Sequence, residues 1–296
     1  MPKLWSGGLK NYIFPGQNGV CPDIVQIACM NVSTGASFNT YVVPRQPIAF
    51  GAQQMTGIIY SNGEMTVHGK EVKAKAIQLA LEDMCAWLEQ FDNVVLLAHN
   101  GRKFDFPVLV TALCNTNLYD RLFASVLACV DALPMFKKVF PNAPSYKLED
   151  LVQTVLGEKY NVHGIIAAVV ALGNLYKFPS TLYTLPSNLS VKDLFAHSFS
   201  LKAIRLNQVY LREKAKHMPS LSALLANGVC KISTAENIAG SGLHLGHLRT
   251  IFTRDGQDGL LRVFQEKNSE GQPRVTYTNR VLESVIPKLA KFFSKK

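Results

Sequence analysis

The stretch LLAHNGRKFD, residues 96–105, holds the side chains best suited to chemistry. An apolar run ends there in a His-Asn pair, Arg102 and Lys103 follow, and Asp105 comes two residues before Pro107. An aspartate just beyond the carboxyl end of a buried strand lies where α/β sheets usually bind ligands. An aspartate shortly before a proline is also favoured as a helix N-cap. These residues alone leave Asp105 either as an active-site acid or as a cap.

The elements that would position this stretch alternate between strands and helices. Short runs rich in β-branched and aromatic residues, bounded by Gly, Pro and Asn, predict strands at 11–14, 24–30 and 37–43, and apolar runs predict buried strands at 93–99 and 125–133. A short helix ending near residues 56–58 and then a loop are expected before an amphipathic helix over 70–91. This order predicts a mixed-sheet α/β domain.

Charge divides the chain at the Pro/Ser/Thr-rich stretch FPSTLYTLPSNLS, residues 178–190. Residues 1–180 carry 14 Lys and Arg against 13 Asp and Glu, whereas residues 181–296 carry 17 against 8. We therefore expect two domains, 1–180 and 181–296, of which the second is basic. Its pattern predicts helices to the end, at 189–216, 220–228, 241–252, 258–267 and 278–293. The excess charge indicates an anionic partner, nucleic acid before an anionic membrane surface, or else a solvated basic surface.

Other candidate sites are weaker. The six cysteines are scattered without a CxxC pair, which predicts reduced core residues and neither a zinc site nor a disulfide framework. His244 and His247 are three apart on an expected helix, but without a third ligand beside them they are expected to be packed or to lie on the helix surface, with Ser241 as the cap of that helix. No apolar run is long enough to span a membrane, and the first residues lack the apolar stretch of a secretory signal, so we expect an intracellular protein, nuclear or cytoplasmic.

Over residues 10–180 the chain resembles the DEDDh three-prime exonucleases of the DnaQ and Trex type. LLAHNGRKFDFPVLVTAL is similar to their second motif, in which a strand ends in His-Asn and an Asp begins the next helix. YNVHGIIAAVVALGNLY occupies the place of their third motif, His-x-Ala-x-x-Asp. The resemblance implies an RNase H-like mixed β-sheet with flanking helices, followed here by a helical C-terminal extension.

Most of the family's metal-binding acids have no counterpart. The resemblance implies two Mg²⁺ ions held by an Asp-x-Glu pair, by the Asp of the second motif and by the Asp of the third. The Asp-x-Glu positions fall on Phe14 and Gly16, and the third-motif Asp falls on Ala168, so that only Asp105 and the histidine, His163, persist. No acidic residue precedes Asp23. Because one carboxylate cannot hold two Mg²⁺ ions, we expect no metal site and no intact catalytic site.

The C-terminal stretches MPSLSALL and VIPKLAKFF resemble the exonuclease-like C-terminal region of the long promyelocytic leukaemia (PML) protein isoform and its stand-alone relatives in fish. We expect a degenerate exonuclease homologue that binds nucleic acid, DNA or RNA, or protein partners; Trex-type relatives also imply a possible homodimer. Candidate phosphate contacts are Asn100, Arg102 and Lys103. The alternative is an active three-prime exonuclease that uses Mg²⁺ or Mn²⁺, with Asp131, or less readily Glu64, replacing a lost acid. Without that alternative no cofactor is expected.

Overall fold

The computed structural model describes residues 3–11, 23–158, 165–177, 196–268 and 271–294. The chain forms two compact units, Met1–Arg205 and Leu206–Lys296. The predicted boundary at 180/181 and the stretch 178–190 lie outside the described residues.

In the first unit, the strands are β1 (Lys3–Asn11), β2 (Ile24–Asn31), β3 (Ser37–Val42), β4 (Ile58–Ser61), β5 (Glu64–Val67), β6 (Lys70–Val72), β7 (Ala74–Lys75), β8 (Val94–Ala98), β9 (Val126–Asp131) and β10 (Ser198–Phe199). Its helices are α1 (Phe50–Thr56), α2 (Ile77–Leu88), α3 (Asp105–Asn115), α4 (Tyr119–Ser125), α5 (Ala132–Val139), α6 (Leu148–Leu151), the π-helical turn η1 (Val152–Leu156) and α7 (Ile165–Lys177). Helix α9 (Leu201–His217) begins in this unit and ends in the second.

The described strands form a seven-stranded mixed sheet in the order β10-β9-β8-β1-β2-β3-β7. Strands β1, β8 and β9 are parallel, whereas β2 is antiparallel to both of its neighbours, β1 and β3. A three-stranded antiparallel sheet, β4-β5-β6, is separate from it. The mixed α/β class expected from the sequence is confirmed.

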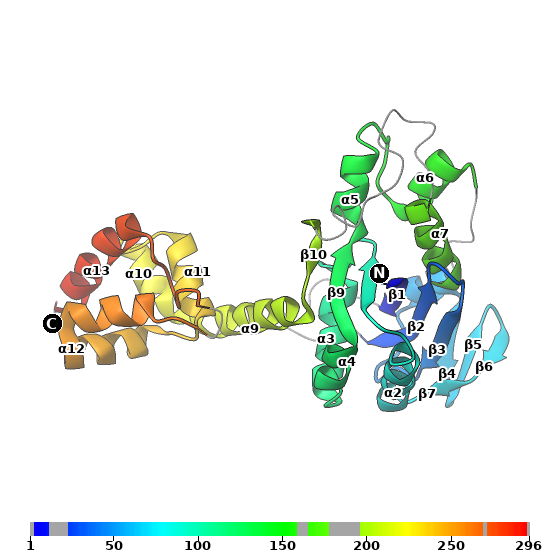
Figure 1. The fold of residues 1–296 in the computed structure, drawn as a ribbon. Helices are drawn as coiled ribbons and strands as arrows, with labels where there is room; N and C mark the ends of the chain where they lie inside the picture. The colour runs from blue at the N-terminus through cyan, green and yellow to red at the C-terminus, as the bar shows by residue number, and fades with distance from the viewer. Residues whose placement is uncertain (1–2, 12–22, 159–164, 178–195, 269–270, 295–296) are drawn as a thin grey trace. The chain divides into compact units, whose positions relative to one another are not determined.

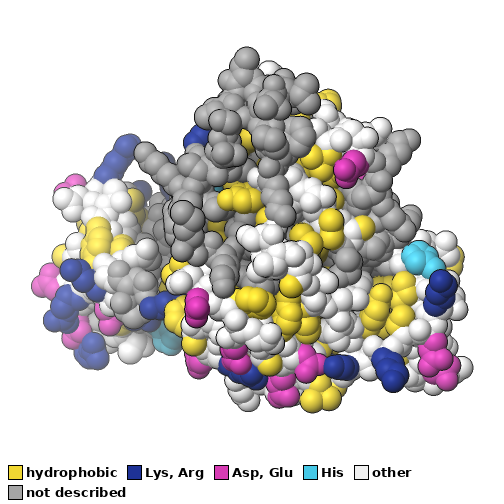
Figure 2. All heavy atoms as spheres, turned by 45° about the vertical axis from the view of Figure 1, so that its right-hand side comes forward, with side chains coloured by type: hydrophobic (Ala, Val, Ile, Leu, Met, Phe, Trp, Pro, Cys, Tyr) yellow, Lys and Arg dark blue, Asp and Glu magenta, His cyan; other side chains and the backbone are white. Residues whose placement is uncertain are grey.

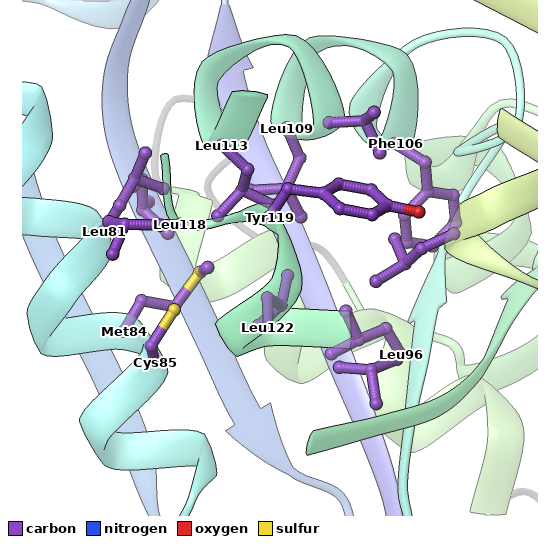
Figure 3. Packing of buried hydrophobic residues seen from close by; sticks show 14 of the residues in the cluster. Leu81, Met84, Cys85, Leu96, Phe106, Leu109, Leu113, Leu118, Tyr119 and Leu122 are labelled. Carbon is purple, nitrogen blue, oxygen red and sulfur yellow. The ribbon is translucent and has the colours of Figure 1, made fainter. Parts of the chain in front are cut away.

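Helices cover both faces of the large sheet (Figure 1). Every residue of β8 is buried, and successive residues alternate between the two layers: Leu96 packs with α2, α3 and α4, whereas Leu97 packs with α5, η1 and α7. Figure 3 shows the first of these cores, in which side chains of α2, α3 and α4 converge with Leu96. A strand buried on both faces explains the almost unbroken apolar run that preceded the His-Asn pair.

The structure corrects several expected elements. The first strand begins at Lys3 and not at residue 11, and the Gly7-Gly8 pair lies inside it, paired with β2; residues 12–14 lie outside the described residues. The expected loop after α1 is the β4-β5-β6 sheet, and the expected helix over 70–91 begins only at Ile77 because residues 70–75 form β6 and β7.

The second unit is helical: α9 leads to the 3₁₀ turn η2 (Met218–Leu221), α10 (Ser222–Ala226), α11 (Ile232–Gly240), α12 (Leu245–Gln265) and α13 (Asn279–Ser294). Helix α11 is absent from the sequence prediction, and α12 joins two predicted helices across a kink at Gly256, whose φ is 65°. One buried apolar cluster holds the unit together, with Leu221, Ile238 and Phe264 among its members.

The structure also bears on the cysteines and on the possibility of a membrane-spanning helix. Five described cysteines are free; burial raises the pKa of Cys29 to about 12 and that of Cys85 to about 11, which keeps both as thiols. In the described part of the chain, no helix is both long and apolar enough to cross a membrane. Acidic and basic side chains are interspersed on the face that Figure 2 shows.

Candidate functional site

The loop 99–105 joins β8 to α3 and forms a tight turn at the carboxyl ends of the parallel strands. Asn100 takes a left-handed conformation, with φ of 56°, and its carbonyl accepts the amide N–H groups of Lys103 and Phe104 at 3.2 Å. Gly101 lies against the core: a Cβ there would lie 2.5 Å from the Cβ of Ala98 and 2.7 Å from the ring of Phe106. The backbone at position 101 can therefore pack this closely against Ala98 and Phe106 only if residue 101 is glycine.

His99 anchors the start of the loop. Its Nε2–H donates to the carbonyl oxygen of Tyr146 at 2.9 Å, and its ring stacks on Phe136 with centroids 6.1 Å apart. Its Nδ1 is buried with no hydrogen-bond partner among the described residues. Burial lowers the pKa of His99, against the smaller raising effects of the Tyr146 hydrogen bond and of Asp131. A neutral, half-buried His99 is a structural anchor for the loop, a role that sequence reasoning missed.

Asp131 ties the loop to the neighbouring strand. It ends β9 directly opposite Ala98, and its Oδ1 accepts the amide N–H of Leu133 at 3.0 Å, which caps α5. Its Oδ2 accepts the amide N–H of Arg102 at 3.2 Å. Both carboxylate oxygens of this buried residue therefore hold backbone, and the idea that Asp131 replaces a lost metal ligand loses support.

Asp105 is half-buried at the head of α3, but it is not the cap of that helix. The N-cap is Phe104, without a side-chain cap bond, and Asp105 is the acidic residue of the first turn. The expected capping role is thus wrong; the carboxylate instead stabilises the helix through the positive end of the helix dipole. Asp105 also lines a small open pocket whose other described lining residues are apolar or cysteine, from α2, α3, β2 and β8.

The remaining predicted residues do not gather around Asp105 in the described structure. Phe14, Gly16 and His163 lie outside the described residues, so their positions stay predictions. Ala168 is on α7, half-buried, and offers no ligand. Glu64 is exposed on β5, in the separate sheet.

The side chains around Asp105 do not suit a pair of metal ions. Strand β1, which lies between β2 and β8, has no acidic residue, and no group of three His, Cys, Asp or Glu able to hold a metal occurs in the described part of the chain. Two close Mg²⁺ ions need several carboxylates, which an apolar pocket with one aspartate does not supply.

Beside Asp105 the loop presents cations and an aromatic ring to solvent. Arg102 and Lys103 are exposed, and Phe104 has 36% of its surface exposed. The Arg102 guanidinium lies 5.2 Å from the ring centroid of Phe199 on β10, and the Lys103 Nζ lies 5.5 Å from that of Phe104. Two cations beside an exposed aromatic ring can contact phosphates and stack on a base, the two interactions that hold single strands. Asn100, by contrast, has a backbone role in the turn.

Of the histidine pair in the second unit, His244 is half-buried and His247 lies on the helix surface, and the His217 ring of α9 lies close to both. The rings of His244 and His247 stack with centroids 3.6 Å apart, and His217 Nε2 lies 3.1 Å from the Oε2 of Glu213. His244, not Ser241, is the cap of α12: its Nδ1 accepts the amide N–H groups of residues 246 and 247. Burial, then the charges of His247, His217 and Lys216, lowers the pKa of His244.

Both units of the chain are similar to known protein families. Residues 16–155 match the Exuperantia RNAse H-like domain family, and residues 217–296 match the family of the PML C-terminal domain. No curated protein matches the chain. A zinc-bound E. coli ExoI–ssDNA complex shares 18% identity, covers 76% of this chain and 45% of that chain, and has a TM-score of 0.51. E. coli Exonuclease I with a dA16 oligonucleotide shares 18% identity, covers 61% of this chain and 41% of that chain, and has a TM-score of 0.50. The chain thus spans less than half the length of these enzymes.

These likenesses show that the first unit has an RNase H-like fold, which it shares with the exonuclease structures. The match of residues 217–296 to the PML C-terminal domain lies in the second unit, so the exonuclease-like and PML parts of the resemblance found in the sequence are confirmed, whereas its DnaQ and Trex part stays an expectation.

Proposed function

We propose that the chain is a catalytically degenerate three-prime exonuclease homologue that binds single-stranded nucleic acid at the loop 99–105. The observation that carries this proposal is the composition of the loop's surroundings: Asp105 persists in an apolar pocket, while Ala168 stands where the family has an acid. The only other described acid held at this loop, Asp131, uses both oxygens for backbone amides.

Binding is supported by the exposed groups of the loop and by the fold. Arg102, Lys103 and Phe104 offer two charges and a stacking surface within three consecutive residues. The E. coli enzyme of similar fold is described in complex with single-stranded DNA and with an oligonucleotide. We propose the same class of ligand here, with DNA and RNA as alternatives because both present the same phosphates, and with protein partners as a further kind of ligand.

Isothermal titration of the full chain with Mg²⁺ and Mn²⁺, followed by a single-stranded oligonucleotide, tests the proposal. We expect no stoichiometric metal binding and salt-sensitive oligonucleotide binding. Stoichiometric metal binding that Asp105→Ala abolishes, together with metal-dependent digestion of the oligonucleotide, would instead establish an active exonuclease with a rearranged site.

Charge reversal identifies the binding surface. The double variant Arg102→Glu, Lys103→Glu is expected to weaken single-strand binding and, if each cation meets one phosphate, to lower the salt slope of the affinity by about 1.4. Lys70→Glu, Lys73→Glu is the matched control, because it makes the same charge change at exposed positions on and just after β6. Equal loss in both variants would show that binding depends on overall charge and not on the loop.

A further inference from the structure

Helices α11 and α12 are joined by a short, closely hydrogen-bonded turn, residues 241–244. Gly242 has φ of 81°, its amide N–H donates to the carbonyl of Ala239 at 3.0 Å, and that of Leu243 donates to the carbonyl of Ile238 at 3.2 Å. This pair of bonds with a left-handed glycine is the Schellman ending of a helix, and the accompanying apolar contact is present because Leu243 and Ile238 are both buried. His244 then caps α12, so the turn has one well-defined conformation.

Helix α9 supports this pair from behind. The Tyr210 ring packs so closely on α11 that a Cβ at Gly240 would lie 2.1 Å from it, and its hydroxyl donates to Oδ1 of Asn237 at 3.2 Å. Lys214 pairs with Glu236 at 3.0 Å, which neutralises the single acid of α11. Two helices joined by a short turn containing glycine, backed by a third helix, form a helix-turn-helix arrangement.

The first half of α12 presents a polar, basic face. Leu248 is fully buried in the cluster of the second unit, whereas the opposite side is exposed at His247, Arg249, Thr250, Thr253 and Arg254. Residues 245–254 include no acid.

Asp255, which follows, does not cancel this charge. Arg254 lies 2.9 Å and Arg262 lies 2.8 Å from the same oxygen of Asp255, so one acid is shared between two arginines. Gly256 then kinks the helix and ends the straight segment. Residues 206–296 as a whole carry 14 Lys and Arg against 7 Asp and Glu, so the face fits an anionic partner.

We infer that α11 and α12 form a helix-turn-helix that binds double-stranded DNA, with the exposed face of α12 over residues 247–254 in the major groove. Arginine, threonine and histidine are side chains that contact phosphates and base edges, and a groove about 12 Å wide admits one helix. The second helix of such a motif enters the groove with its N-terminal residues at the bases, which is the position of His247, Arg249 and Thr250 in α12. This site is separate from the loop 99–105 and does not depend on the function proposed for it.

Fluorescence anisotropy with the full chain tests the inference. The probes are a labelled mixed-sequence DNA duplex about two helical turns long, the corresponding RNA duplex and the single DNA strand, each at about 50 and about 200 mM salt. We expect the wild-type chain to bind the DNA duplex more tightly than the RNA duplex, because the major groove of A-form RNA is too narrow for a helix. Arg249→Glu is expected to weaken DNA-duplex binding at least about tenfold.

Arg280→Glu is the matched control. Arg280 is exposed in the first turn of α13, about 20 Å along that helix from Phe293, the residue that Arg249 contacts. Circular dichroism verifies that both variants keep their helices. Equal duplex affinities for the two variants, no duplex binding by the wild-type chain, or equal binding of RNA and DNA duplexes would each overturn the inference. Because Arg102→Glu, Lys103→Glu acts on single-strand binding, the two proposals fail independently.

Discussion

Replacement of Gly101 by alanine tests whether the loop 99–105 is held by close packing. The backbone of Gly101 is outside the left-handed region, so an alanine is strained there only by what its methyl meets. That methyl would lie 2.5 Å from the Cβ of Ala98 and 2.7 Å from the Phe106 ring, whereas carbon atoms pack at about 3.5–4.0 Å. One or more of these groups must therefore move by about 1 Å.

Neither Ala98 nor Phe106 can move without losing packing or pairing. Ala98 is 2% exposed and lies on β8, which pairs with strands on both sides, and Phe106 is 3% exposed and packs edge-to-face on Phe199. Overpacking of this kind costs about 1–3 kcal/mol, and the entropy that alanine removes from the unfolded chain offsets about 0.5 kcal/mol. We expect the free energy of unfolding to fall by about 2 kcal/mol, which lowers the Tm of a unit of this size by about 4–8 °C.

Thermal unfolding followed by tryptophan fluorescence measures this loss, because both tryptophans, Trp5 and Trp87, lie in the first unit. Gly51→Ala is the matched control: Gly51 is inside α1 with nothing within 4 Å of its Cβ position, so alanine there should leave stability unchanged or raise it by up to about 1 kcal/mol. If Gly101→Ala unfolds at the wild-type temperature, the loop can relax away from the sheet and the reasoning is wrong.

Two further predictions follow from the same contacts. Asp131→Ala removes the cap of α5 and the acceptor of the Arg102 amide and should cost about 2–3 kcal/mol in the fluorescence melt, whereas Asp131→Asn, which keeps one acceptor oxygen, should cost less; equal costs would contradict the assigned roles. For His244, whose pKa is lowered in the folded chain, the unfolded state binds more protons below about pH 6.5, so stability should fall as the pH drops through that value. His244→Asn keeps a good cap and should flatten this pH dependence in melts followed by circular dichroism; an unchanged slope would assign it to other groups.

The α/β order of the first unit could be predicted because its strands differ in burial. Strand β8 is buried on both faces, which leaves a wholly apolar run, and α2 carries one apolar face. The β4-β5-β6 sheet was missed, and the start of β1 was placed too late in the sequence, because these segments lack a clear apolar pattern. Residues 58–72 are mostly polar or half-exposed, and a Gly-Gly pair inside β1 resembles a turn until its pairing with β2 is known.

The local chemistry of the candidate site followed from residue types, but its roles did not. The sequence located the loop after β8 and its cations, whereas the alignment of the family acids with Phe14, Gly16 and Ala168 stays a prediction. It left Asp105 as either an active-site acid or a cap and treated Asp131 as a possible metal ligand, because whether a carboxylate holds backbone amides or faces an open site depends on partners from other elements. The same is true of α11, whose four-residue turn into α12 became visible only with its hydrogen bonds.

What the sequence determined by itself is therefore what depends on neighbours along the chain: the apolar run of β8, the uneven division of charge, and the missing acids before Asp23. What the tertiary structure decided depends on groups far apart in the chain. Only folding brings Asp131 to the amide of Arg102, Tyr146 to His99, and Tyr210 to Gly240. Hydrogen bonding and close packing act over a few ångströms in space, so no local pattern of residues can specify them.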